Sequence, residues 1–272
     1  MHQTKEMLLT GKVAVVTGST AGIGKGIAKA FLQAGAAHVF INGRSEATVQ
    51  KTIDAFRAEN LTNVSGVIAD LSSAEGFNQF INQIASSGKT VDVVVNNMGV
   101  FGTKDFFDVT DEEWDNYFQV NVMSTVRVSR YFLKQMLERN SGRIIIVSSE
   151  AGVRPIPDMV PYSMSKAAQI NIARGLAELT KGTKVTVNSL LPGPTATEGA
   201  DKIVEGLAQQ TGKSKEEAAR GFFAEREPTS LIQRFLTVEE VANTALFLAS
   251  DLSSGINGAA QLVEGGIIRA IK

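Results

Sequence analysis

The chain has 272 residues, with 27 Lys and Arg against 28 Asp and Glu, and a formal net charge of −1 at pH 7. This balance argues against a nucleic-acid-binding protein, which usually carries a basic excess. The lack of Cys excludes disulfides, cysteine zinc sites and thiol catalysis. With His only at positions 2 and 38, we expect neither a histidine-based metal site nor a Ser-His-Asp triad.

The sequence shows neither a targeting signal nor a membrane anchor. Met1–Lys12 lacks the apolar core of a secretory signal. The longest apolar runs, such as Ile144–Val147, are four or five residues long, whereas a membrane helix needs about 20. We expect a soluble, cytoplasmic protein without a membrane partner.

Short β-branched segments alternate with longer helical patterns along the chain. The predicted strands are, in order, Val13–Thr17, His38–Asn42, Val64–Ala69, Val91–Val95, Arg143–Val147, Val185–Leu190 and Ala260–Val263. Continuous apolar strands separated by helices are typical of a parallel sheet covered on both faces. The pattern predicts a doubly wound α/β fold of the Rossmann type, organised as one domain over residues 1–272.

Three helix starts carry the capping-box pattern, at Ser72–Glu75, Thr110–Glu113 and Thr237–Glu240. Residues Thr195–Ser230, called the 195–230 segment below, depart from the strand–helix rhythm because they are polar, helical in pattern and unusually long for a connection. We expect a helical lid here, and the alternative is a surface helical hairpin without a role. Its seven acidic and five basic residues would make a poor docking surface for an acidic carrier protein.

Ligands of open parallel sheets bind beyond the carboxyl ends of the strands. The first strand is followed by Thr17–Gly24, whose glycines allow a tight turn and close approach of the backbone to a phosphate at a helix start. The spacing differs from the common Gly-x-Gly-x-x-Gly, so a glycine turn without a ligand stays an alternative. The candidate phosphate-binding residues are Gly18, Ser19, Thr20, Ala21, Gly22, Ile23 and Gly24.

The end of the second strand bears on the choice of nucleotide. A carboxylate there would bind a ribose 2′-hydroxyl and repel a 2′-phosphate, but Asn42, Gly43 and Arg44 offer none. The Arg44 guanidinium, followed by Ser45, suits a phosphate dianion. This favours NADP(H) as the cofactor, with NAD(H) as the alternative. The alternative is that Arg44 is a solvated surface arginine that binds no phosphate.

Polar residues also follow the third and fourth strands. Asp70 could accept a hydrogen bond from an adenine amino group, or could cap the turn together with Ser72. Asn96–Gly99 forms a tight polar turn, which a simple connection would explain as well.

The strongest group of candidate catalytic residues follows the fifth strand. Ser149 comes 13 residues before Tyr162, and Lys166 lies four residues after it, one helical turn away on the same face. The ordinary pKa of tyrosine is about 10, and a nearby ammonium or an oxidised nicotinamide would lower it. Tyr162 could then exchange a proton with a carbonyl or alcohol oxygen, to which Ser149 would donate a hydrogen bond.

Together these motifs resemble, in the same order, those of the short-chain dehydrogenase/reductase family, from about Gly11 to Gly266. The motifs that carry the resemblance are TGxxxGIG at Thr17–Gly24, Asp-Leu at Asp70–Leu71, NNAG at Asn96–Gly99 with Met98 in place of Ala, PGxxxT at Pro192–Thr197, and a C-terminal Asp-Gly-Gly counterpart at Glu264–Gly266.

The resemblance implies four catalytic residues: Asn121, Ser149, Tyr162 and Lys166. It implies that Asn121 holds a water of a proton relay and that Lys166 also binds the nicotinamide ribose. Its other implied cofactor contacts are Asp70, Leu71, Asn97, Gly99, Tyr162, Pro192, Gly193, Thr195 and Thr197.

The resemblance also bears on cofactor preference and assembly. Arg44 stands where NADP-preferring members have a basic residue, whereas Ala21 replaces their second one. Members usually form tetramers through two long helices, here about Asp111–Arg139 and Tyr162–Lys181. We therefore expect a homo-oligomer, either a tetramer or a dimer.

The leading hypothesis is an NADP(H)-dependent oxidoreductase that acts on a small carbonyl or secondary alcohol. A general likeness to 3-oxoacyl-carrier-protein reductases leaves an acyl thioester as the alternative substrate. An NADP-binding regulator or scaffold without turnover would usually lose the tyrosine or the lysine, and this chain keeps Tyr162 and Lys166. A dehydratase or epimerase of the same fold would usually have a different glycine loop.

Overall fold

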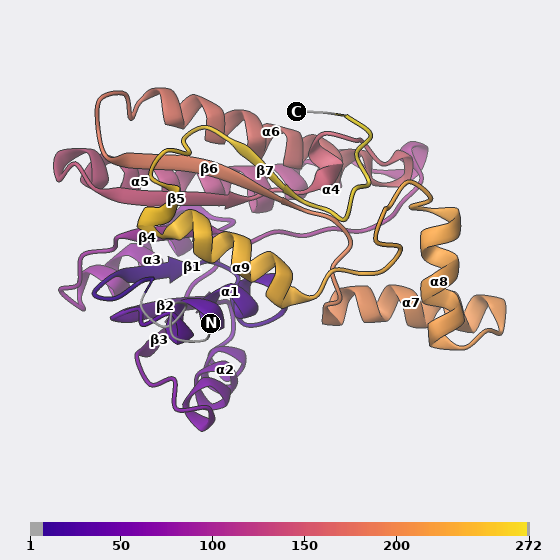
Figure 1. The fold of residues 1–272 in the computed structure, drawn as a ribbon, viewed down its shortest axis with the longest axis horizontal. Helices are drawn as coiled ribbons and strands as arrows, with labels where there is room; N and C mark the ends of the chain where they lie inside the picture. Colours follow the sequence, from indigo (N-terminus) through magenta and orange to yellow (C-terminus); the bar gives the residue numbers. More distant parts are fainter. Residues whose placement is uncertain (1–7, 271–272) are drawn as a thin grey trace.

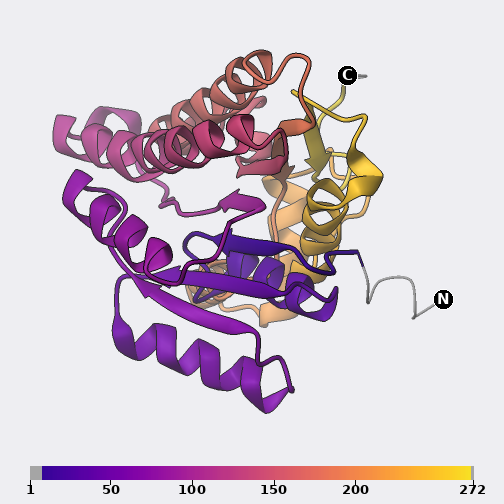
Figure 2. The same cartoon turned by 90° about the vertical axis from the view of Figure 1, so that its left-hand side faces the viewer.

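The computed structural model describes residues 8–270; Met1 to Met7, including His2, and the last two residues lie outside this range. Within it, parallel strands form one sheet in the order β3-β2-β1-β4-β5-β6-β7. The sheet lies between two layers of helices (Figures 1 and 2). The predicted doubly wound α/β fold is thereby confirmed, with the reversal of strand order between β1 and β4.

The strands lie close to their predicted positions: β1 Val13–Val16, β2 His38–Gly43, β3 Val64–Ile68, β4 Val93–Asn96, β5 Gly142–Val147, β6 Val185–Pro192 and β7 Ala260–Val263. The prediction was wrong at the start of β4. β4 starts after Asp92 because the Asp92 carboxylate, not a backbone carbonyl, accepts the Val13 N–H at 2.9 Å. β6 continues to Pro192, which pairs with Val263 of β7.

Alternating strand residues divide the core into two halves. Ala14 and Val16 of β1 join the half that contains residues of α1 (Gly22–Gln33), α2 (Glu46–Ala58) and α9 (Val238–Ala249). Val15 joins the half formed with α3, α5 and α6, which span Ala74–Ala85, Ser124–Glu138 and Val160–Glu178. Both faces of the sheet are thus buried, as the continuous apolar strands predicted.

The predicted long helix Asp111–Arg139 is interrupted. It consists of α4 (Asp111–Tyr117), a π-helical turn (Phe118–Met123) and α5. The turn changes which side chains face inward, and it buries Asn121 completely. Such π-helical turns occur frequently at functional sites.

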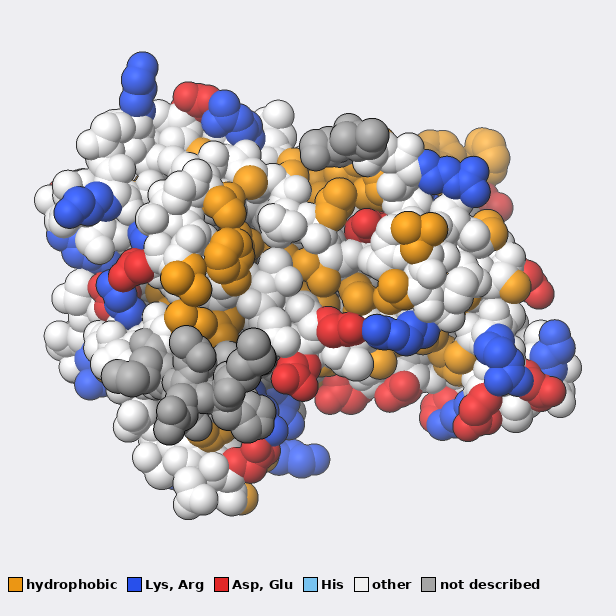
Figure 3. Space-filling model, in the orientation of Figure 1, with side chains coloured by type: hydrophobic (Ala, Val, Ile, Leu, Met, Phe, Trp, Pro, Cys, Tyr) orange, Lys and Arg blue, Asp and Glu red, His pale blue; other side chains and the backbone are white. Residues whose placement is uncertain are grey.

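The 195–230 segment contains two helices, α7 (Glu198–Thr211) and α8 (Lys215–Glu225), which stand out at one end of the molecule (Figure 1). Charged side chains of both signs gather over this end (Figure 3). Phe222 of α8 stacks on Phe235 with 5.1 Å between ring centroids, which joins the segment to the following chain. No helix within residues 8–270 is both long and apolar enough to cross a membrane.

The capping boxes at Thr110–Glu113 and Thr237–Glu240 are confirmed, and a third occurs at Ser214–Glu217. The one predicted at Ser72–Glu75 was wrong. Ser73 is the N-cap of α3, and its hydroxyl accepts the Gly76 N–H at 3.0 Å. Gly76 has no side chain that could return a bond, so the reciprocal box cannot form.

Exchange of the two neighbouring serines tests this capping assignment. Ser73→Ala should lower the free energy of unfolding by about 1 kcal/mol, because an N–H of the first turn of α3 loses its acceptor. Ser72→Ala is the matched control, since Ser72 enters the turn through its backbone N–H and carbonyl. Urea unfolding followed by circular dichroism measures both, and a larger loss in Ser72→Ala would contradict the assignment.

Candidate active site

The loop between β1 and α1 is held by the turn that follows β4. The Thr17 hydroxyl accepts the backbone N–H groups of Asn97 and Met98, both at 3.0 Å. The Asn97 side-chain amide donates in return to the carbonyls of Thr17 and Gly18, at 3.0 and 2.9 Å. Gly18 has φ of 58°, and a β-carbon there would lie 2.9 Å from Met98 Cα. The close approach of the two loops therefore requires glycine at this position.

The N-terminus of α1 binds the carboxylate of Glu198. The Gly22 N–H donates to the carboxylate of Glu198, the first residue of α7, at 3.1 Å. The N-cap residue Ala21 provides no side-chain acceptor of its own. Free N–H groups at a helix start attract phosphate in the same way as carboxylate, so the loop fits the phosphate groups of a nucleotide.

A cavity of about 440 Å³, the glycine-loop cavity, runs along this loop. The predicted cofactor residues that line it are Gly18, Thr20, Ala21, Gly22, Ile23, Gly24, Arg44, Asn97, Gly99, Tyr162, Lys166 and Thr197. The structure thus brings most of the predicted nucleotide contacts together at the carboxyl ends of β1, β2 and β4.

Four predicted cofactor residues line neither this cavity nor the second one described below: Ser19, Ser45, Asp70 and Leu71. Ser19 is buried, and its hydroxyl donates to the Val16 carbonyl and accepts the Asn42 N–H. The Asp70 carboxylate accepts the Ser72 N–H at 3.0 Å, which is the turn-capping alternative. Leu71 is fully buried in the core. Local backbone contacts therefore account for Ser19 and Asp70.

A second cavity, of about 630 Å³, is called the Ser149 cavity here. Tyr162 borders both cavities, and the predicted residues Pro192, Gly193, Thr195 and Thr197 line this one. Its apolar wall comes from Phe101, Ile156, Met159, Leu207, Phe222 and Phe235. The 195–230 segment thus supplies part of the wall, as a lid would.

Ser149, Tyr162 and Lys166 are close together, as their spacing predicted. The side chains of Ser149 and Tyr162 lie close enough for the serine hydroxyl to lower the pKa of the phenol. Lys166 Nζ lies 5.5 Å from the centroid of the Tyr162 ring. The ammonium donates to the Val147 carbonyl at the end of β5 and to Gln169 Oε1, both at 3.0 Å. A proton donor, a second hydroxyl and a buried cation therefore meet where the two cavities join.

The pKa of Tyr162 shifts upward, opposite to the predicted direction. Burial raises the pKa of Tyr162 to about 12, and the Ser149 hydroxyl lowers it only in part. Burial also lowers the pKa of Lys166 to about 7. Removal from water disfavours the charged form of both groups, and it is the largest cause of both shifts.

Asn121 sits behind the lysine and is joined to it through Gln169. Its side-chain amide donates to the Val100 carbonyl and the Ser165 hydroxyl, and its oxygen accepts the Val100 N–H. Gln169 accepts from Lys166 and donates to the Asn121 carbonyl at 2.7 Å. We did not predict Gln169, although it lies seven residues after Tyr162 on the same face of α6.

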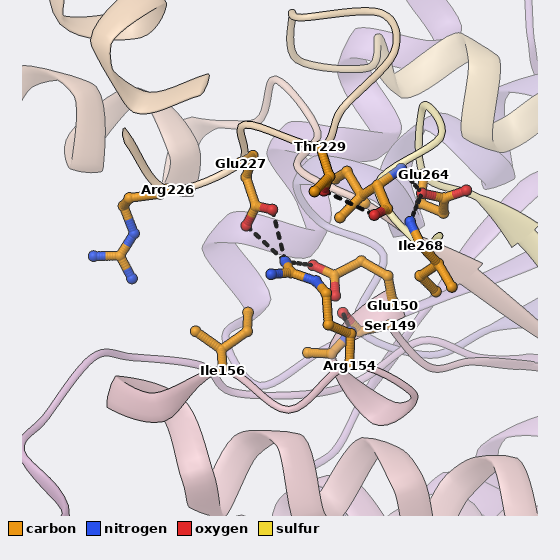
Figure 4. A network of polar contacts seen from close by, with 12 residues as sticks. Ser149, Glu150, Arg154, Ile156, Arg226, Glu227, Thr229, Glu264 and Ile268 are labelled. Atoms are coloured by element: carbon orange, nitrogen blue, oxygen red, sulfur yellow. Dashed lines mark hydrogen bonds and ion pairs between the residues drawn. The ribbon is translucent and has the colours of Figure 1, made fainter. Parts of the chain in front are cut away.

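Two charged residues that line the Ser149 cavity, Glu150 and Glu227, and the nearby Arg154 were given no role from the sequence. Glu150 directly follows Ser149, Arg154 lies one short turn later, and Glu227 ends the 195–230 segment (Figure 4). Nothing in the spacing joins Glu227 to the other two, since it is 73 residues from Arg154 in the chain.

Comparison with known proteins agrees with this geometry. The family model of the short chain dehydrogenases matches residues 12–208. The chain is 55% identical over 266 residues to the uncharacterized oxidoreductase YvrD of Bacillus subtilis (strain 168), a match that covers 98% of this chain and 100% of that protein. It is 33% identical to the 3-oxoacyl-[acyl-carrier-protein] reductase FabG of Aquifex aeolicus (strain VF5), with 96% and 99% covered.

Among solved structures, the L-sorbose reductase of Gluconobacter frateurii complexed with NADPH and L-sorbose superposes with a TM-score of 0.91 at 29% identity. That match covers 98% of this chain and 100% of the other. The chain belongs to the short-chain dehydrogenase family. It is accordingly an NAD(P)-dependent oxidoreductase, which confirms the resemblance seen in the motifs.

The contact between Glu198 and Gly22 predicts competition with an incoming nucleotide. Glu198→Ala should raise the affinity for NADPH about two- to fivefold, because a negative charge at a helix start is worth about 0.3–1 kcal/mol. Fluorescence titration with NADPH measures this effect. Glu205→Ala is the control, since Glu205 lies on the same helix but pairs with Lys215. Equal affinities in both variants would contradict the competition.

Proposed function

We propose that the chain is an NADP(H)-dependent carbonyl reductase that acts reversibly on a small carbonyl or secondary alcohol. The observation that carries this proposal is the position of Tyr162, beside Ser149 at the junction of the glycine-loop cavity and the Ser149 cavity. A nucleotide along the glycine loop and a substrate beside Ser149 would both reach this hydroxyl.

A bound nicotinamide supplies the hydride that the carbonyl carbon accepts. In the reductive direction the Tyr162 hydroxyl donates its proton to the carbonyl oxygen, so the C=O bond becomes a C–OH bond. Its high pKa favours the protonated form that this step needs. Ser149 donates a hydrogen bond to the same oxygen while charge develops there.

Lys166 and Asn121 support the proton transfer from behind the tyrosine. Lys166 is buried beside the Tyr162 ring, where its charged form stabilises a phenolate left after proton donation. Asn121 helps to fix the position of the lysine because Gln169 binds both residues. We infer that Asn121 also holds the water through which the proton is replaced.

Arg44 supports NADP(H) over NAD(H). Its exposed side chain lines the glycine-loop cavity at the end of β2. The neighbouring Asn42 is buried, and its side chain is engaged with the Gly18 N–H and the carbonyls of Val67 and Ala69. A 2′-phosphate would therefore meet a guanidinium and no carboxylate of β2.

A small free carbonyl compound is favoured over an acyl thioester. The likeness to a reductase crystallised with L-sorbose supports a small hydroxylated ketone. The likeness to an acyl-carrier-protein reductase supports the alternative, a 3-oxoacyl thioester. The mixed charges of the 195–230 segment favour the first, because an acidic carrier would meet an acidic excess there. We further infer a cytoplasmic homotetramer or dimer, for which the faces of α5 and α6 are the candidates.

The role of Tyr162 is tested by Tyr162→Phe. Loss of the hydroxyl removes the proton donor and should lower turnover about 10²- to 10⁴-fold, while NADPH binding is kept. The decrease of NADPH absorbance measures turnover, with L-sorbose and acetoacetyl-CoA as the two probe carbonyls. Turnover of acetoacetyl-CoA alone would favour the thioester alternative. Full activity of Tyr162→Phe would overturn the mechanism.

The cofactor preference is tested by Arg44→Ala. We expect about a tenfold or larger loss of NADPH affinity, because hydrogen bonds to charged groups contribute about 1.5–3 kcal/mol. The affinity for NADH should stay nearly the same, since NADH has no 2′-phosphate. Equal losses for both nucleotides in calorimetric titrations would show that Arg44 does not read the phosphate.

A further inference from the structure

A chain of three charged side chains joins the 195–230 segment to the residue after Ser149 (Figure 4). Arg154 Nη2 donates to both carboxylate oxygens of Glu227, at 2.8 and 2.7 Å, and lies 3.7 Å from Glu150 Oε1. The side chains of both glutamates are only 5% exposed, whereas that of Arg154 is 34% exposed. One guanidinium therefore serves two nearly buried carboxylates.

The backbone places these three residues on two separate parts of the chain. Glu150 opens the short 3-10 turn Glu150–Gly152, and the Arg154 N–H donates to its carbonyl at 2.9 Å. Glu227 follows α8, and so belongs to the part of the chain that stands out from the fold. Any shift of the 195–230 segment relative to the 3-10 turn would pull Arg154 with Glu227, or leave Glu227 without its partner.

The Glu150 carboxylate is incompletely compensated. Its Oε2 is buried and finds no hydrogen-bond partner within residues 8–270. The charged or ionisable groups that face it are Arg154, Glu227 of the segment, Glu264 after β7, and Tyr162 of α6. Burial raises the pKa of Glu150 to about 7; Arg154 opposes this rise, while Glu227 and Glu264 add to it. Its charge thus changes near neutral pH.

The charge on Glu150 affects the pKa of Tyr162. Ionised Glu150 raises the pKa of Tyr162, against the Ser149 hydroxyl, which lowers it. Arg154 favours the ionised form of Glu150, whereas Glu227 favours the protonated form. The two members of the ion pair therefore affect Glu150, and through it Tyr162, in opposite directions.

We propose that Arg154 and Glu227 are positioning residues through which the 195–230 segment sets the charge on Glu150, and so adjusts proton transfer at Tyr162. Glu150 is the group that connects the segment to the reaction, without needing to touch the substrate. The effect on the reaction rests on the proposed function, whereas the effect on the charge of Glu150 is independent of it.

A second ion pair provides a matched control. Arg226, next to Glu227 in the chain, donates to both oxygens of Asp158, at 2.9 and 2.7 Å. This pair also ties the end of the 195–230 segment to the body of the protein, but Asp158 is not among the groups that act on Glu150. Asp158→Asn thus weakens the same attachment and leaves the charges around Glu150 in place.

Carbon-13 NMR of protein labelled at the glutamate carboxyl carbons tests whether Arg154 and Glu227 set the charge on Glu150. The Glu150 resonance is identified by its loss in Glu150→Gln. We expect its titration midpoint to rise by about one pH unit in Arg154→Met and to fall in Glu227→Gln, with no change in Asp158→Asn. Equal midpoints in all variants, or an equal shift in Asp158→Asn, would overturn the proposal.

The pH dependence of kcat/KM tests whether the charge on Glu150 affects proton transfer at Tyr162. The substrate is a carbonyl compound that the wild type reduces. The descending limb of the reductive kcat/KM should lie near the Glu150 midpoint, because ionised Glu150 raises the pKa of Tyr162 and makes it a weaker proton donor. This limb should move to higher pH in Arg154→Met and to lower pH in Glu227→Gln, as the NMR midpoint does. Arg154→Met should cause no further shift in a Glu150→Gln background. An unmoved limb alongside shifted NMR midpoints would disprove the link to Tyr162. A wild type that reduces no carbonyl would instead disprove the proposed function, which the NMR titration does not need.

Discussion

Lys166 carries an ammonium into the interior, and the arrangement around Tyr162 depends on how that charge is held. Only 4% of the residue is exposed, and an unpaired ammonium in such a place would be costly. Its bonds to the Val147 carbonyl and to Gln169 satisfy it without a carboxylate. The Ser148 hydroxyl donates to the Lys166 carbonyl at 2.7 Å and fastens α6 to the end of β5 from the other side. The meeting of Ser149 and Tyr162 follows from these contacts.

The same burial explains why the contact between Lys166 and Tyr162 was predicted correctly but the direction of the Tyr162 pKa shift was not. The four-residue spacing placed Lys166 beside Tyr162, but spacing says nothing of depth. Because Lys166 loses water as well, its pKa falls to about 7, so part of the positive charge is lost near neutral pH. An ammonium that is partly deprotonated near neutral pH offsets the burial of the phenol only in part. The pKa of Tyr162 therefore depends mainly on burial and on two polar neighbours, Ser149 and Glu150.

The sequence predicted what local chemistry determines. Strand positions follow from β-branched runs, and the glycine loop follows from turn geometry, so both were found within a few residues. The sequence could not choose between two roles of Asp70, because a carboxylate after a strand suits an adenine and a turn equally well. Gln169 lay within reach of the helical spacing argument. The pairing of Arg154 with Glu227 did not, because it depends on how a long insertion folds back over the sheet.

The insertion itself unites these observations. At its start, Glu198 binds the glycine loop; at its end, Glu227 binds Arg154 beside the Ser149 cavity. Each contact places a carboxylate on a positively polarised or charged group of the fold, and the two carboxylates line different cavities. A nucleotide phosphate at the loop would take the place of the first carboxylate and leave the second contact intact.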